Sequence, residues 1–168
     1  MTPDLPPDLL RVHAFSDDVL GRLDAVGLAE ALQRGDLSAT EATEAAIARV
    51  AAVDAPLGAM AYRTFERALM QTRQRRSGYF AGVPTVIKDN TDVAGVPTRH
   101  GTDCYVAAPA TRNSEMTKLF GKLGLVSLGK SQLSEFGISA TAEHPRLGPV
   151  RNPWDTTRVA GGSSAGSA

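Results

Sequence analysis

Cysteine and histidine are scarce in this sequence. Only one of the 168 residues is a cysteine, Cys104, so no internal disulfide can form, and the segment around it lacks the spacing of metal ligands. The three histidines, His13, His100 and His144, lie far apart, and each is interpreted as a surface or structural residue rather than a catalytic one. The sequence therefore favours neither a disulfide framework nor a metal site.

An excess of charge of one sign and long apolar runs are missing as well. Lysine and arginine total 18, as do aspartate and glutamate, so the formal net charge of +0 gives no electrostatic reason to expect a nucleic-acid or acidic-membrane partner. No apolar run approaches the roughly 20 residues of a membrane span, and residues 1–6 lack the basic and apolar regions of a secretory signal. With 42% hydrophobic residues, we expect a soluble, cytoplasmic protein.

Three segments of different character follow one another along the chain. Residues 1–16 are rich in proline and aspartate and predict an extended arm. Residues 17–78 carry apolar residues at helical spacing and predict a helical layer. Residues 79–168 alternate helical patterns with short apolar runs, which predicts an α/β core, and they end in a glycine- and serine-rich loop. We interpret 1–168 as one domain of the α/β class.

Capping and turn residues set the expected limits of the elements. Ser38 and Glu41 form a capping box, in which the hydroxyl and the carboxylate accept orphan backbone N–H groups at a helix start. Gly35 and Gly124 are placed as helix terminators, and Pro84 suits only the start of a strand or a sheet edge. The expected helices are 20–34, one behind Ser38 that ends near 54–56, 63–76 and 114–123, and the expected strands are 83–87 and 125–128.

The last stretch of the sequence, residues 161–168, is composed of glycine, serine and alanine. Such a composition is typical of a flexible linker. Two features favour a functional loop: the segment follows Asn-Pro-Trp at 152–154, which is foreign to linkers, and its serines interleave with glycines. Glycines of this kind let the backbone fold tightly and present N–H groups and hydroxyls in one concave site. Composition alone leaves both interpretations open.

A lysine, Lys88, directly follows the apolar run at 83–87. From its position alone, the ordinary interpretation is a solvated side chain. A lysine at the end of a buried strand can instead enter a dry cleft, where desolvation favours the neutral amine and makes it a general base. The choice between these two interpretations needs information beyond this segment.

The segment 124–131 matches the phosphate-binding pattern G-x-x-x-x-G-K-[ST]. That mechanism needs a strand before the first glycine and an open polar loop between the two glycines. Here a helical pattern precedes Gly124, and the intervening Leu-Val-Ser-Leu is itself the predicted strand. Because backbone N–H groups committed to a sheet cannot bind phosphates, we reject this motif.

Four motifs follow one another along the chain, and the first of them, residues 81–90, reads A-G-V-P-T-V-I-K-D-N. It is similar to the G-[VI]-P-x-x-[VI]-K-D-N stretch of the amidase-signature enzymes, in which Lys88 takes the place of the lysine. Three further stretches follow in the family's order: 129–130 with 135–136, then 148–154, then 161–164. The resemblance covers nearly the whole chain from about residue 20, and it implies a large mixed sheet flanked by helices, of which this chain supplies the N-terminal helices and the first strands.

The resemblance implies a Ser–cis-Ser–Lys triad. Lys88 would be the base, Ser163 the bridging serine after a cis peptide bond, and Gly161, Gly162 and Ser164 part of the signature loop. The family's nucleophilic serine lies farther along, in a D-x-G-G-S context beyond position 168, so we expect it to lie outside this chain. We also expect the Gly162–Ser163 bond to be trans or disordered here, because contacts from later strands would be needed to hold it cis.

The implied activity is that of a carboxylic-amide hydrolase that acts on a small-molecule amide without metal or organic cofactor. A homo-oligomer of the full-length enzyme is compatible with this interpretation. Two departures stand out: Ala165 replaces the usual glycine, and residues 134–139 lack the D-E-F-A-M-G-S wording of the tRNA-dependent amidotransferase A subunit. The second departure favours a stand-alone amidase. An amidotransferase subunit, which would require partner subunits, and a non-catalytic truncated fragment remain alternatives.

Overall fold

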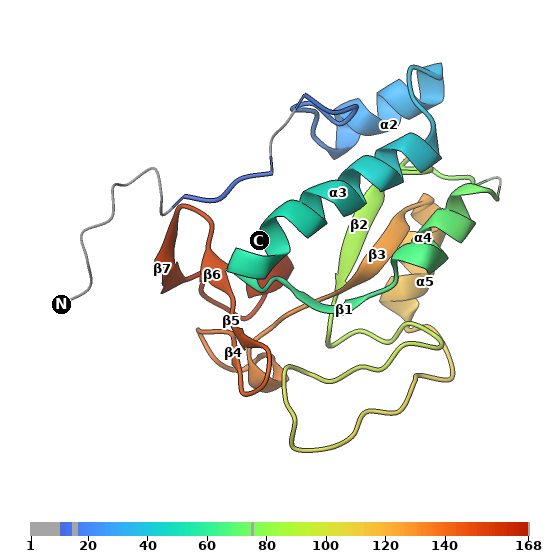
Figure 1. The fold of residues 1–168 in the computed structure, drawn as a ribbon. Coiled ribbons are helices and arrows are strands. Elements are labelled where there is room, and N and C mark those ends of the chain that lie inside the picture. The colour runs from blue at the N-terminus through green and yellow to red at the C-terminus, as the bar shows by residue number, and fades with distance from the viewer. Residues whose placement is uncertain (1–10, 15–16, 75, 168) are drawn as a thin grey trace.

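A three-stranded mixed sheet with helices on both faces forms the centre of the computed structural model, which describes residues 11–14, 17–74 and 76–167 (Figure 1). The strands lie in the order β1-β3-β2, with β1 antiparallel and β2 parallel to β3. Their bounds are Met60–Arg63 for β1, Pro84–Lys88 for β2 and Val126–Ser131 for β3. The α/β class and the two strands expected from the sequence are thus confirmed.

Apolar side chains pack the helices onto the two faces of the sheet. Within the described residues, the α-helices are α2 (Ala25–Arg34), α3 (Ala39–Leu57), α4 (Phe65–Thr72) and α5 (Glu115–Leu123). On one face, Val126 and Leu128 of β3 are buried with Ala68 of α4, against side chains of α3. On the other face, Ile87 of β2 packs with Phe120 of α5. The alternation of side chains along each strand separates these two cores.

Local capping chemistry explains where the helices begin and end. The capping box is present: Ser38 Oγ accepts the Glu41 N–H, and Glu41 accepts the Ser38 N–H. Gly35 and Gly124 end their helices in the left-handed conformation, as expected. Helix α2, predicted to begin at residue 20, begins later because Asp24 caps it by accepting the Gly27 N–H at 2.8 Å.

Three expectations for the elements need correction. The stretch predicted as a helix over 63–76 is helical only over Phe65–Thr72, because Met60–Arg63 forms strand β1. Strand β3 is longer than expected and runs on to Ser131. Two small hairpins were not predicted, β4 (Glu143–His144) with β5 (Gly148–Pro149) and β6 (Arg151–Asn152) with β7 (Asp155–Val159).

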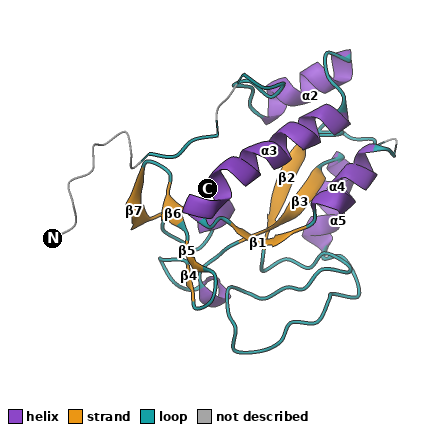
Figure 2. Cartoon of the chain, viewed as in Figure 1, coloured by secondary structure: helices purple, strands orange, loops and turns teal. Residues whose placement is uncertain are grey.

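The segments that follow β2 and β3 lie at one end of the sheet, and those that precede the two strands lie at the other. Figure 2 shows the long loop between β2 and α5 at the same end as the β4–β5 hairpin. The arm predicted at 1–16 lies mostly outside the described residues; within it, the Val12 N–H donates to the Pro153 carbonyl at 2.8 Å. Within the part of the chain that the structure describes, none of the helices combines the length and apolarity that membrane crossing requires.

Two glycines give a matched test of backbone packing. A Cβ at Gly129, in β3, would overlap the Tyr62 carbonyl oxygen of β1, whereas a Cβ at Gly121, in α5, would meet open space. We expect Gly129→Ala to lower the free energy of unfolding by about 2 kcal/mol or more, and Gly121→Ala to raise it by about 0.5–1 kcal/mol. Denaturant titration measures both, and equal effects would contradict the packing described.

Candidate active site

Lys88 and the signature loop meet in the structure although they are distant in the sequence. Lys88 is the last residue of β2, and its Nζ lies 2.8 Å from Ser163 Oγ and 2.9 Å from Ser164 Oγ. Lys88 and Ser163 are half-buried, whereas Ser164 is exposed. The parallel strands β2 and β3 end at the same edge of the sheet, which is where ligands commonly bind in open α/β sheets.

Strand β3 and the residues after it hold the signature loop. The Ser134 N–H donates to the Ser163 carbonyl at 3.3 Å, and the Gly166 N–H donates to the Gln132 carbonyl at 3.0 Å. Ser131, whose Cα is the register partner of Lys88, shares a hydrogen bond of 2.5 Å with the Ser167 hydroxyl. The loop therefore takes its position from the strand that pairs with β2.

The Gly162–Ser163 peptide bond is cis. The expectation of a trans or disordered bond in this chain is therefore wrong. That expectation assigned the enforcing contacts to later strands, whereas in this chain the backbone at Gly162 packs against residues 139–140. A Cβ at Gly162 would lie 2.7 Å from the Ser139 carbonyl oxygen, so this backbone passes too close to 139–140 for any larger residue.

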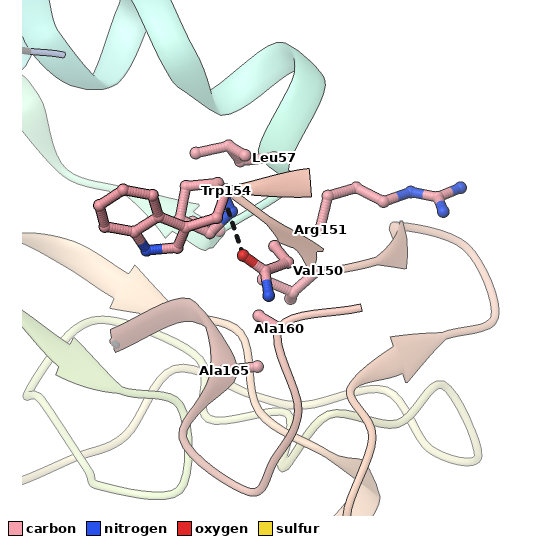
Figure 3. A pocket seen from close by; sticks show the side chains of 9 residues that line it. Leu57, Val150, Arg151, Trp154, Ala160 and Ala165 are labelled. Atoms are coloured by element: carbon pink, nitrogen blue, oxygen red, sulfur yellow. Dashed lines mark hydrogen bonds between the residues drawn. The ribbon is translucent and has the colours of Figure 1, made fainter. Parts of the chain in front are cut away.

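An apolar cavity of about 230 Å³ lies behind the signature loop (Figure 3). In that view Leu57 and Trp154 lie on one side of the cavity, with Ala160 and Ala165 on the other. Ala165, the departure from the family's glycine, is 5% exposed and belongs to an apolar cluster with Ala142 and Val150. Its methyl group therefore has a packing role, which explains why this loop position accepts a side chain.

A buried ion pair beside Lys88 was missed by sequence reasoning. Lys130, from the rejected phosphate motif, lies inside β3, beyond the predicted end of that strand at 128; its side chain is 1% exposed and its Nζ lies 2.7 Å from Asp89 Oδ1. Lys130 Nζ also donates to Thr98 Oγ1 at 3.1 Å, and Asp89 Oδ2 accepts the Arg99 N–H at 3.2 Å. The available signal was that Asp89 follows Lys88 directly while Lys130 extends a buried strand.

The histidines lie apart from the lysine–serine contact. His144 is buried, and its Nδ1 accepts the N–H groups of Arg146 at 3.1 Å and Leu147 at 3.2 Å. His100 stacks on Phe136, and both residues have a positive φ. Over 11–14, 17–74 and 76–167, no three His, Cys, Asp or Glu side chains come together in a way that could hold a metal ion.

The fold and this geometry define the class: an α/β domain that presents a lysine amine to two serine hydroxyls at the end of a parallel strand pair. A family model described as Amidase matches residues 41–168. The chain belongs to the amidase family.

Known relatives agree with this membership. The chain is 57% identical over 157 residues to the AmiC protein of Mycobacterium leprae, whose name assigns it to the amidases; the match covers 94% of this chain and 34% of that one. The A subunit of the glutamyl-tRNA(Gln) amidotransferase of Thermobifida fusca is 38% identical, over 87% of this chain and 31% of its own. The chain thus spans about a third of the length of the curated relatives it matches.

A solved structure shows the same architecture. The 6-aminohexanoate cyclic dimer hydrolase, solved in complex with its substrate, superposes with a TM-score of 0.80 at 34% identity, over 86% of this chain and 30% of that chain. This likeness bears out the expected fold, in which N-terminal helices and the first strands belong to the amidase-signature architecture.

The environment of His144 predicts a dependence of stability on pH. Burial lowers the pKa of His144, and Asp103 nearby opposes this effect. The unfolded chain then takes up a proton before the folded protein does as the pH falls below about 6.5, so the free energy of unfolding should decrease in that range. His144→Asn, which keeps an acceptor near the Nδ1 position, should reduce this dependence in denaturant titrations at several pH values. If the free energy of unfolding changes with pH in the same way in both proteins, the result would contradict this role of His144.

Proposed function

We propose that this chain is the N-terminal portion of an amidase that hydrolyses small carboxylic amides by Ser–cis-Ser–Lys acyl transfer. The observation that carries the proposal is the pair of hydrogen bonds from Lys88 Nζ to Ser163 Oγ and Ser164 Oγ, at 2.8 and 2.9 Å. Membership of the amidase family supports it independently. No metal or organic cofactor takes part in the proposed reaction.

In the proposed reaction Lys88 is the general base and Ser163 the proton relay. The neutral Lys88 amine takes the Ser163 hydroxyl proton, while Ser163 takes the proton of the nucleophilic hydroxyl. The nucleophile attacks the amide carbonyl, and collapse of the tetrahedral intermediate breaks the C–N bond. The proton returns along the same path to the leaving amine, and water then releases the acid from the acyl-enzyme.

The nucleophile in this proposal is a serine beyond position 168, in the D-x-G-G-S context of the family. Ser164 and Ser167 of the present loop do not match that context; Ser164 Oγ contacts Lys88 Nζ, and the Ser167 hydroxyl is hydrogen-bonded to Ser131. The backbone N–H groups of the later glycine segment would stabilise the oxyanion. Gly162 allows the close passage of the backbone beside Ser163, and Gly161 supplies a left-handed conformation with a φ of +87° just before it.

A stand-alone amidase is favoured over an amidotransferase subunit. The identity to AmiC is 57%, against 38% to the amidotransferase A subunit, over a similar share of this chain. The two functions differ in what they require, because an amidotransferase subunit works with partner chains whereas an amidase works alone. Ammonia release from simple amides by the full-length protein alone supports the amidase, and release that requires added partner subunits would support the alternative.

The first kinetic prediction concerns Lys88. In the full-length protein, Lys88→Ala should lower kcat by about 10²–10⁴-fold, the usual loss when a general base is removed, while the protein stays folded. Lys118→Ala is the matched control, because Lys118 is an exposed residue of α5 in an ion pair with Glu115. Steady-state kinetics on both variants decides the role, and wild-type activity in Lys88→Ala would refute it.

The second prediction is that residues 1–168 alone do not hydrolyse amides. Lys88 and Ser163 can move a proton, but without the proposed nucleophile no acyl-enzyme forms. An ammonia assay with aliphatic and aromatic amides, run on the chain alone and on the full-length protein, measures this. Turnover by the chain alone that disappears in Ser164→Ala or Ser167→Ala would place the nucleophile inside this loop instead.

A further inference from the structure

The buried ion pair between Lys130 and Asp89 lies immediately next to the proposed base. The two side chains are 1% and 2% exposed, and their charged atoms are 2.7 Å apart. Burying two charges is costly unless they are paired and hydrogen-bonded, and replacing such a pair by apolar groups is often neutral or stabilising. Stability alone is therefore a weak reason for this pair, and its location suggests another role.

The pair joins the two strands that place Lys88 and Ser131. In the register of β2 and β3, Ile87 faces Lys130 and Lys88 faces Ser131. Asp89 lies in the turn that follows β2, and its carboxylate contacts Lys130, whereas the Lys88 amine contacts Ser163 of the loop. The Asp89 main chain is held at the same point, because its N–H donates to the Ser131 carbonyl at 3.1 Å and its carbonyl accepts the His100 N–H at 3.0 Å.

The pair also engages the carboxylate that is nearest to Lys88 in the sequence. Asp89 is the carboxylate next to Lys88 in the sequence, and its two oxygens are occupied by Lys130 Nζ and the Arg99 N–H. Among the described residues, no ion pair involves Lys88, and its side-chain partners are the two serine hydroxyls. An amine held by hydroxyls rather than by a carboxylate is the arrangement that a lysine base needs.

We propose that Lys130 and Asp89 are positioning residues for Lys88. Their ion pair connects the ends of β2 and β3, and Lys130 engages the Asp89 carboxylate that lies next to Lys88. In this way the pair holds the Lys88 amine against Ser163 and Ser164. This inference rests on the proposed amidase function, in which Lys88 is the base.

Charge-neutral variants separate positioning from stability. In the full-length protein, Asp89→Asn and Lys130→Met each leave one buried charge unpaired, so both should lower the melting temperature and kcat. The double variant removes both charges and should recover most of the melting temperature. Its kcat should remain about 10–100-fold below wild type, because a displaced base loses its reactive geometry, with KM changed less than about 3-fold.

The exposed pair Glu115–Lys118, at 2.6 Å, is the matched control. Glu115→Gln combined with Lys118→Met should leave kcat and the melting temperature unchanged. Recovery of wild-type kcat in the double variant of the buried pair would show a purely structural role and overturn the inference. A rise in KM at unchanged kcat would overturn it as well.

A measurement without turnover keeps the inference distinct from the proposed function. In the full-length protein, NMR of the Lys88 ε-methylene group reports its contact with Ser163. Ser163→Ala should shift this signal when Lys130 and Asp89 are present, and should have little effect in the Asp89→Asn/Lys130→Met background. Equal shifts in both backgrounds overturn the positioning role, even if the full-length enzyme is active. A shift that is lost in the Asp89→Asn/Lys130→Met background supports the positioning role, even if the full-length protein hydrolyses no amide.

Discussion

The contact between the Lys88 amine and the Ser163 and Ser164 hydroxyls is the interaction on which the functional part of the structure depends. It requires an amine at the end of β2, a loop that reaches this amine from a distant part of the sequence, and a fixed position of the loop relative to β2. Strand β3 provides that fixed position, because it pairs with β2 through Ser131 and then holds the loop through Gln132 and Ser134. The catalytic proposal thus rests on the register of one parallel strand pair.

Small residues and apolar packing keep the loop in place around this contact. Gly162 and Gly166 bring the backbone against 139–140 and against Ala59 and Gln132, where a Cβ would overlap main-chain atoms. Ala165 turns its methyl group into the apolar cluster on the opposite side. Polar side chains therefore face Lys88 while the rear of the loop is packed, and this division is what allows a half-buried amine and two hydroxyls to meet in one geometry.

Elements with local signals were predicted well from the sequence, whereas those that depend on tertiary contacts were not. Helix α5 was expected from Ser114 and Gly124, which cap it, and the order of the motifs already assigned Lys88 and Ser163 to one site. Strand β1 was missed because its four residues form a strand only through pairing with β3. The burial of Lys130 was missed for a related reason, since only the fold brings Asp89 and Thr98 to its amine.

The most direct test of the central claim is to label the full-length protein with a serine-directed fluorophosphonate and to map the modified residue by mass spectrometry. The account predicts a single modified serine beyond position 168, whose rate of labelling falls about 10²-fold or more when Ser163 is replaced by alanine, since the relay to Lys88 is then broken. Modification of Ser163, Ser164 or Ser167, or labelling that is unaffected by Ser163→Ala, would contradict it.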